Sequence, residues 1–253
     1  MGNKLKNAPL IEAIFEIKWL PKSPSKLPTD PHYSLIIGRL FDRLEKEYPF
    51  HEPLPTAQMP IEIANGIVQH RLRKGKNQWP VVQLGPGIFT VNDTAQYKWE
   101  DFKKRVINGV ATLYQVYPNS QADLKVNDLV LRYINAIQFD FERDNIVEFL
   151  KEKMQIGITM HSSLFDDSVK DKPAEVDCRF SFTCTNPPAL IKLRLAKGKI
   201  QDNDALIWEM IIHSQTQNIP ALPSGLENWL QAAHDIAERW FLKLASELLE
   251  SFR

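Results

Sequence analysis

Segments in which apolar and polar side chains alternate constrain the fold of this chain more than any other feature of its sequence. The clearest example runs from residue 175 to residue 185. Its apolar set is Val176, Cys178, Phe180, Phe182 and Cys184, and its polar set is Glu175, Asp177, Arg179, Ser181 and Thr183. A period of two residues is that of a β-strand with one buried face. Several such segments joined by short turns predict an antiparallel sheet with one face packed and the other in water.

The first half of the chain predicts a strand, a helix, several short strands and a second helix. In chain order we expect a strand at 11–19 with Ile11 on its buried side, followed by a proline-rich loop at 21–31. A helix should start at Asp30 and Pro31 and stop before Pro49, and a further loop has prolines at 53, 55 and 60. Strands at 61–64, 67–73, 80–84 and 88–91 and a helix at 97–117 complete this half.

The second half predicts the same order of elements. We expect a long strand at 129–141 with Asn135 in its inward register, a short helix from an Asp144 cap to about Met154, strands at 175–185, 189–197 and 205–214, and a last helix that begins with a capping box of Ser224 and Glu227.

These two halves, 1–120 and 121–253, define the predicted organisation. The fold class is α+β, an antiparallel sheet with helices on one face, built from two strand-helix-strands-helix modules that form one compact unit. The order of elements in the whole chain is similar to the repeat of the TATA-binding-protein superfamily. The order of elements in the second half alone is similar to that of a helix-grip domain. Both likenesses concern the order of elements and imply no activity.

Composition excludes several broad classes of protein. Lysine and arginine number 31, and so do aspartate and glutamate, so no strong uniform field surrounds the protein. Charges interrupt every apolar stretch before it could cross a membrane, and the N-terminus lacks the pattern of a secretory signal. We therefore expect a cytoplasmic protein. Cys178 and Cys184 would lie ~20 Å apart along one strand, so they are expected to be reduced thiols that cannot bridge each other.

Motifs that carry preset chemistry are missing from the sequence. The one glycine cluster, Gly85-Pro86-Gly87, lacks the pattern of a phosphate-binding loop. The six histidines and two cysteines lack metal-ligand spacings, and no nucleophile elbow is present. We expect no cofactor, no metal and no catalytic residue that can be identified from a motif.

Two polar residues interrupt apolar patterns and are candidates to contact a ligand. Asn135 faces inward, where a buried amide must find partners or cost roughly 1–3 kcal/mol, so it is either a core anchor or a ligand contact. His234 lies at the edge of the apolar stripe of the last helix, with Glu238 one turn further on. In a helix-grip domain this edge faces a cavity above the sheet, and we add Arg132 to the candidates. The alternative is a half-buried histidine held by Glu238 or by a nearby loop.

Two clusters of basic residues raise the question of nucleic acid. They comprise Arg71, Arg73, Lys74 and Lys76 in one hairpin, and Lys192, Arg194, Lys197 and Lys199 in another. Such hairpins could follow a phosphate backbone, but the sequence pI is near 7, whereas nucleic-acid-binding domains typically exceed about 9. We therefore interpret both clusters as solvated surface and do not expect nucleic acid as the main partner.

Several short segments together resemble a known group of proteins. They are the run from Asn7 to Ile17, the Leu84-Gly85-Pro86-Gly87 turn with Tyr97 and Trp99, the Arg132-Tyr133-Ile134-Asn135 strand, and Trp229 to Phe241 with Ala233-His234. In these the chain resembles a sporadically distributed family of uncharacterised prokaryotic proteins of about this length. The resemblance implies no reaction and no site residue. The patchy distribution suggests carriage on mobile elements and a role accessory to defence.

Three functional hypotheses follow from the sequence. The first is a non-enzymatic binding or accessory protein that acts through a protein partner, because aromatic residues are abundant and preset chemistry is missing. The second is small-molecule binding or catalysis in a cavity under the last helix. The third is nucleic-acid binding through the basic hairpins. Exposed hairpin edges also leave self-association open.

Overall fold

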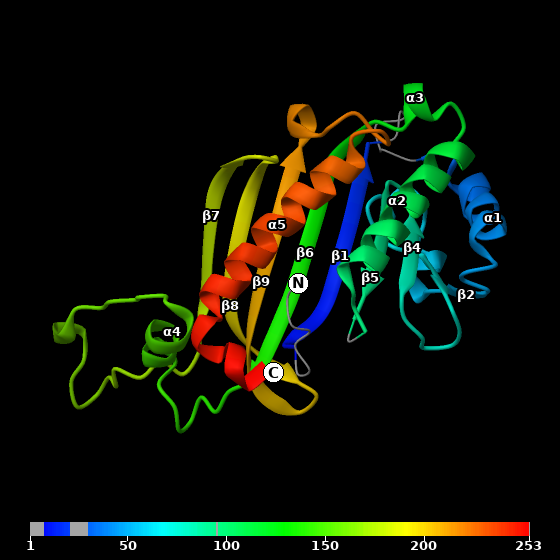
Figure 1. Ribbon diagram of the computed structural model, residues 1–253. Helices are drawn as coiled ribbons and strands as arrows, with labels where there is room; N and C mark the ends of the chain where they lie inside the picture. The colour runs from blue at the N-terminus through cyan, green and yellow to red at the C-terminus, as the bar shows by residue number, and fades with distance from the viewer. Residues whose placement is uncertain (1–7, 21–29, 95, 253) are drawn as a thin grey trace.

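The alternating segments pair into one antiparallel sheet (Figure 1). This computed structural model describes residues 8–20, 30–94 and 96–252, and over these residues the sheet has nine strands in the order β2-β3-β4-β5-β1-β6-β9-β8-β7. Their bounds are β1 Leu10–Trp19, β2 Phe50–Pro53, β3 His70–Arg73, β4 Val81–Gly85, β5 Ile88–Asp93, β6 Val126–Gln138, β7 Asp177–Thr185, β8 Pro188–Ile200 and β9 Asn203–Gln215. The predicted α+β class with an antiparallel sheet is confirmed.

The two halves of the chain meet where β1 pairs with β6. In that pairing Phe15 lies opposite Leu131 and Ile17 opposite Leu129. Within each half the first strand also pairs with the last, β1 with β5 and β6 with β9. The strand order is therefore similar on the two sides of the central pair.

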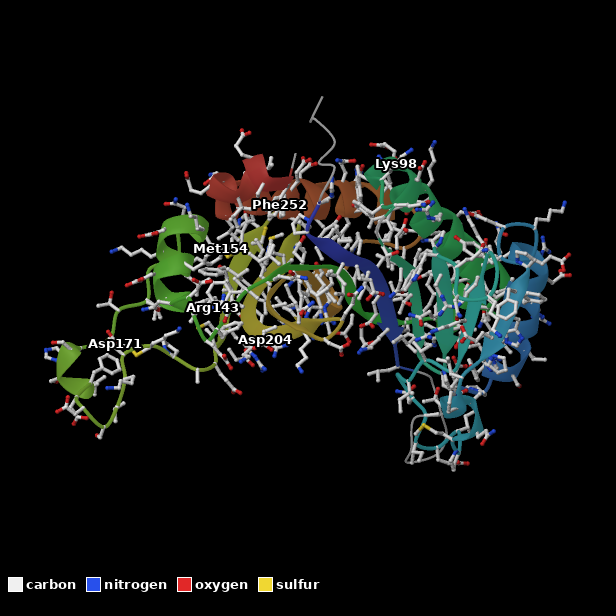
Figure 2. All side chains as sticks on the ribbon, turned by 90° about the horizontal axis from the view of Figure 1, so that it is seen from below. Lys98, Arg143, Met154, Asp171, Asp204 and Phe252 are labelled. Atoms are coloured by element: carbon white, nitrogen blue, oxygen red, sulfur yellow. The ribbon has the colours of Figure 1, made fainter. Side chains whose placement is uncertain are left out.

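Helices cover one face of this sheet. The longer ones are α1 Tyr33–Leu44, α2 Trp99–Val116, α4 Ile146–Met154 and α5 Leu226–Leu244; the short ones are α3 Ser120–Asp123, η1 Pro55–Gln58, η2 Ser162–Leu164, η3 Thr216–Asn218 and η4 Ser246–Phe252. Figure 2 shows α2, α5 and η4 along one side of the sheet. The buried residues of α1, α2 and α5 join the inward residues of β1, β4, β5 and β6 in one core cluster.

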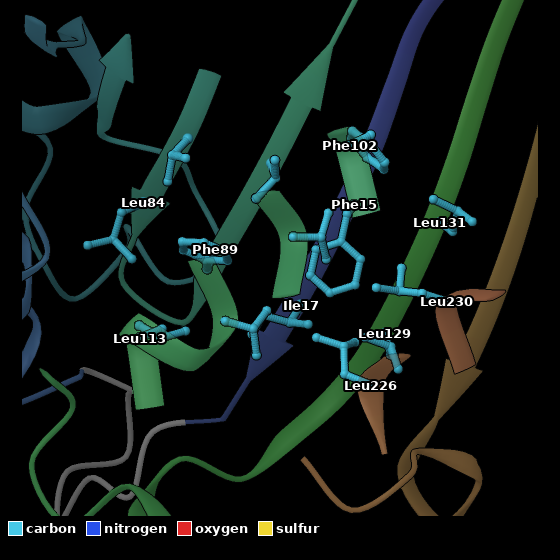
Figure 3. Close-up of a cluster of buried hydrophobic side chains, with 14 of the residues drawn as sticks. Phe15, Ile17, Leu84, Phe89, Phe102, Leu113, Leu129, Leu131, Leu226 and Leu230 are labelled. Carbon is cyan, nitrogen blue, oxygen red and sulfur yellow. The ribbon is translucent and has the colours of Figure 1, made fainter. Parts of the chain in front are cut away.

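That core is filled by large side chains from distant parts of the chain (Figure 3). Phe15, Phe89 and Phe102 are fully buried in it. Gly109 lets α2 approach β5, because a Cβ atom there would lie 2.9 Å from Cζ of Phe89. A second cluster lies at the other end of the sheet, where Leu150 of α4 and Phe252 of η4 pack with residues of β8 and β9.

Two predictions near the start of the chain need correction. Ile11 is 44% exposed, because the pairing of β1 with β6 shifts register between Leu10 and Glu12 and leaves it in a bulge. The first long helix starts at Tyr33, and Asp30 is a buried anchor before it: its carboxylate accepts hydrogen bonds from the Trp19 indole at 2.9 Å and from the His32 backbone at 2.9 Å. The loop expected at 21–31 lies, up to residue 29, outside the described residues.

Further corrections concern short elements and helix caps. Residues 61–64 form turns instead of a strand, while β2 occupies a segment that was expected to be loop. The cap of α4 is Asn145, whose side chain accepts a hydrogen bond from the Val147 N–H at 3.0 Å, and not Asp144. The expected capping box does not form, because α5 begins after Gly225 without a side-chain cap.

Candidate functional site

A cavity of about 150 Å³ lies between α5 and the central strands β6 and β9. Most of its wall is apolar, with Leu10, Met210, Ala237 and Phe241 among the lining residues. Five residues supply polar atoms: Tyr97, Tyr133, Asn135, His234 and Glu238. The helix edge that carries His234 and Glu238 therefore lies beside the inward face of β6 that carries Asn135, as the second sequence-based hypothesis requires.

A chain of hydrogen bonds crosses one wall of the cavity. The Tyr97 and Tyr133 hydroxyl oxygens lie 2.9 Å apart, and the Tyr133 hydroxyl lies 2.9 Å from Nδ1 of His234. One arrangement satisfies all three groups: Tyr97 donates to Tyr133, and Tyr133 donates to a neutral imidazole. His234 is also stacked on Trp99, with ring centroids 3.8 Å apart. Its partners are thus Tyr133 of β6 and Trp99 of α2, whereas the alternative expected Glu238 or a nearby loop.

Burial keeps these groups uncharged. It raises the pKa of the Tyr97 and Tyr133 phenols well above their usual value. Burial also lowers the pKa of His234 to about 4, which outweighs the opposite influence of Asp235 and Glu100. At neutral pH the chain of hydrogen bonds is therefore neutral, and none of its three members titrates near pH 7.

Asn135 occupies the inward register that its position in the sequence predicts. It is 3% exposed and lies opposite Leu10 of β1 and Trp208 of β9. Its side-chain Nδ2 has no hydrogen-bond partner among the described residues, and the same holds for the indole Nε1 of Trp208. A buried donor left in this way costs roughly 1–3 kcal/mol. The amide N–H of Asn135 therefore does not serve as a core anchor.

The remaining cavity candidate, Arg132, lies elsewhere. Its side chain donates to the Glu209 carboxylate at 2.8 Å, and both residues are on the opposite face of the sheet from Tyr133. Neighbouring strand residues point to opposite faces, so Arg132 cannot share the cavity with Tyr133 and Asn135. The expectation that it contacts a ligand there is wrong.

Three residues of the site were not predicted as site residues from the sequence: Tyr97, Tyr133 and Trp99. Tyr133 resembles any inward aromatic residue of a strand, and Tyr97 and Trp99 resemble the apolar start of a helix. The signal that could have found them is that a buried phenol needs a hydrogen-bond partner. This requirement does not identify the partner, because the two phenols and the His234 imidazole lie far apart in the sequence.

The two basic hairpins do not come together. β3 and β8 are six strand positions apart, which is about 29 Å across the sheet. Several of the basic side chains have polar or acidic neighbours: Arg71 with Gln83, Arg73 with Glu52, Lys192 with His213, Arg194 with Asp177 and Lys197 with Asp204. For Lys74, Lys76 and Lys199, no ion pair forms among the described residues.

Comparison with known proteins adds no assignment: no family model, curated protein or solved structure matches the chain. Within the described residues, no helix is both long enough and apolar enough to cross a membrane. Those residues also contain no group of three or more histidine, cysteine or acidic side chains placed to hold a metal ion.

Proposed function

We propose that this protein binds a small, mainly apolar molecule with a hydrogen-bond acceptor in the cavity under α5. The observation that carries the proposal is that Asn135 lines the cavity while its buried Nδ2 has no partner among the described residues. Buried polar groups are nearly always hydrogen-bonded in folded proteins, so an orphan donor in a cavity wall points to a partner that comes from outside. A carbonyl oxygen on the ligand would fill this role.

The size and charge of the cavity define the class of ligand. A cavity of about 150 Å³ is large enough for one benzene ring. The one lining residue with a carboxylate is Glu238, which has no hydrogen-bond or ion-pair partner among the described residues. An anionic ligand would be repelled there, and a neutral or cationic one would not. We therefore propose a neutral or cationic molecule with one ring or a short aliphatic chain.

The polar groups favour binding over acid-base catalysis. A general base works best when its pKa lies near the working pH. The pKa of His234 is lowered to about 4 and both phenol pKa values are raised, so these groups supply hydrogen bonds of fixed polarity at pH 7.

The proposal can be tested with three single-ring probes: benzamide, benzoate and toluene. Saturation-transfer NMR at millimolar probe concentration is expected to show the strongest binding for benzamide. Benzoate should bind more weakly because of Glu238, and toluene more weakly because it contacts only the apolar wall. Replacing Asn135 by leucine should abolish the preference for benzamide over toluene by removing the amide donor. Equal signals from benzamide and toluene in the wild-type protein would contradict the role of Asn135.

A matched control separates ligand contact from general damage. Arg132→Leu is such a control, because residue 132 lies on the same strand but on the other face. This variant is expected to keep the wild-type order of probe signals. Loss of benzamide binding in Arg132→Leu as well would show that the effect is not specific to the cavity.

A further inference from the structure

The outer edge of β7 exposes both backbone and aromatic groups. Among the described residues β7 pairs only with β8, so its other side is open. Phe180 is 38% exposed and Phe182 46% exposed, although both are on the face that the helices cover elsewhere. Trp240 of α5 reaches Phe182, with ring centroids 5.4 Å apart, but does not cover it. Exposed edges of this kind are templates for strand addition.

One hydrogen bond fixes which residues direct their backbone outward. The Lys197 N–H donates to the Val176 carbonyl oxygen at 2.9 Å across the β7–β8 ladder. Backbone groups alternate along an antiparallel strand, so the even-numbered residues of β7 bond to β8 and the odd-numbered ones point to the open edge. Pro188, which has no backbone N–H, lies opposite Thr185. This fits the alternation, because the odd-numbered residues of β7 do not require a hydrogen bond from the backbone of β8.

The even-numbered side chains of β7 are arranged symmetrically about Ser181. Cysteine stands three residues to either side, at 178 and 184, and phenylalanine stands one residue to either side, at 180 and 182. A strand with this pattern is complementary to a second copy of itself in antiparallel orientation.

We propose that two copies of this chain pair through β7, with a two-fold axis at Ser181 that joins their sheets into one. This register places Phe180 opposite the partner's Phe182 and Cys178 opposite the partner's Cys184. The odd-numbered residues then form the hydrogen-bonded pairs, Ser181 with the partner's Ser181 and Arg179 with the partner's Thr183. The even-numbered residues form the non-hydrogen-bonded pairs, in which side chains lie closest.

The register agrees with the charges and the surroundings of the strand. Arg179 and Asp177 each face a threonine across the axis, so no like charges lie directly opposite one another. The segment between α4 and β7 projects beyond the sheet at the Asp177 end (Figure 1). The pairing therefore extends over residues 178–184, and it is independent of the cavity under α5.

Solution mass tests the dimer through the residue on the axis. Light scattering after size exclusion is expected to give a dimer for the wild-type chain and monomers for Ser181→Lys and Ser181→Glu, because each variant places like charges face to face. A mixture of the two variants should restore the dimer. A monomeric wild-type chain at 100 μM, or a dimer that survives in both variants, would overturn the proposal. Far-ultraviolet circular dichroism spectra that match the wild type verify that the variants fold.

The native cysteines test the register. Opposed positions of this kind place Cα atoms about 4.5 Å apart, within the range that a disulfide spans. With copper(II)–phenanthroline as oxidant, the wild-type chain should form a disulfide-linked dimer on non-reducing gels. Cys178→Ser and Cys184→Ser should each lose the link completely, because every bridge joins residue 178 to the partner's residue 184. Mixing the two variants should restore a link, whereas cross-linking of either variant alone would exclude this register.

Discussion

The two ends of the sheet differ in how completely they are covered. In the N-terminal half all six residues of β5 are buried, and α1 and α2 fill the space above the strands. In the C-terminal half, seven of the nine residues of β7 are exposed, and α5 leaves the outer edge of this strand bare. The cavity under α5 lies between the halves, because Leu10 and Tyr97 also line it. The comparison teaches that one sheet can be covered unevenly: α1 and α2 bury the strands beneath them, whereas β7 at the opposite edge stays largely exposed.

The largest contrast should come from removing one phenylalanine ring in each half. Phe89→Ala empties a fully buried site, and we expect a loss of about 3–5 kcal/mol in the free energy of unfolding. Phe182→Ala removes a ring that is 46% exposed and should cost about 1 kcal/mol or less. Urea unfolding at low protein concentration measures both. Equal losses would show that the two ends are packed alike.

Acid should weaken the packing under α5. Because the pKa of His234 is lowered from 6.5 to about 4 by burial, the unfolded chain binds its proton at a higher pH than the folded chain does. The contribution of His234 to the free energy of unfolding is present in full above pH 6.5. It is lost as the pH falls from 6.5 to 4, by an amount on the order of 3 kcal/mol. Urea unfolding at several pH values should show this loss in the wild-type chain and a smaller one in His234→Gln. The same slope in both proteins would argue against a neutral, buried His234.

Two buried polar residues under α5 should respond in opposite directions. Ser214 is fully buried; it donates to the Pro188 carbonyl at 2.6 Å and accepts from the Trp229 indole at 2.9 Å. Ser214→Ala leaves both groups unpaired and should cost roughly 1–3 kcal/mol. Asn135→Leu removes an orphan donor and should raise stability by about 1 kcal/mol while it alters probe binding. Thermal and urea unfolding report both, and a loss in Asn135→Leu as large as in Ser214→Ala would mean that the amide has a structural partner.

The smallest contrast lies within β1. Ile17→Val should cost about 0.5–1.5 kcal/mol, because Ile17 is fully buried. Ile11→Val should change stability by less than about 0.5 kcal/mol, since the bulge exposes this side chain. Comparable losses in the two variants, measured by urea unfolding, would place Ile11 in the core after all.

Much of the fold could be predicted because strand periodicity is a local property. It located β1 and β6 to β9 and put Asn135 on the inward face. The same periodicity could have excluded Arg132, because positions 132 and 135 differ by an odd number and so face opposite sides. The bulge at Ile11 could not be predicted in this way, since it depends on how β1 pairs with a strand from the other half of the chain.

Only part of the candidate site could be predicted from the sequence. His234 and Glu238 share a helix edge, so their proximity follows from helical spacing. Their meeting with Tyr97, Tyr133 and Asn135 depends on the packing of three separate elements, which no local pattern encodes. The cap of α4 shows the same limit on a smaller scale: Asp144 and Asn145 can both cap a helix, and the local backbone decides which side chain reaches the Val147 N–H.

The position of β1 in the middle of the sheet also affects how the chain can fold during its synthesis. Its pairing with β5 becomes available early, but the partner for its other side, β6, leaves the ribosome several seconds later at ordinary rates of elongation. The nascent N-terminal half must therefore wait with one long edge of its sheet unpaired, at a point where chaperones could bind it.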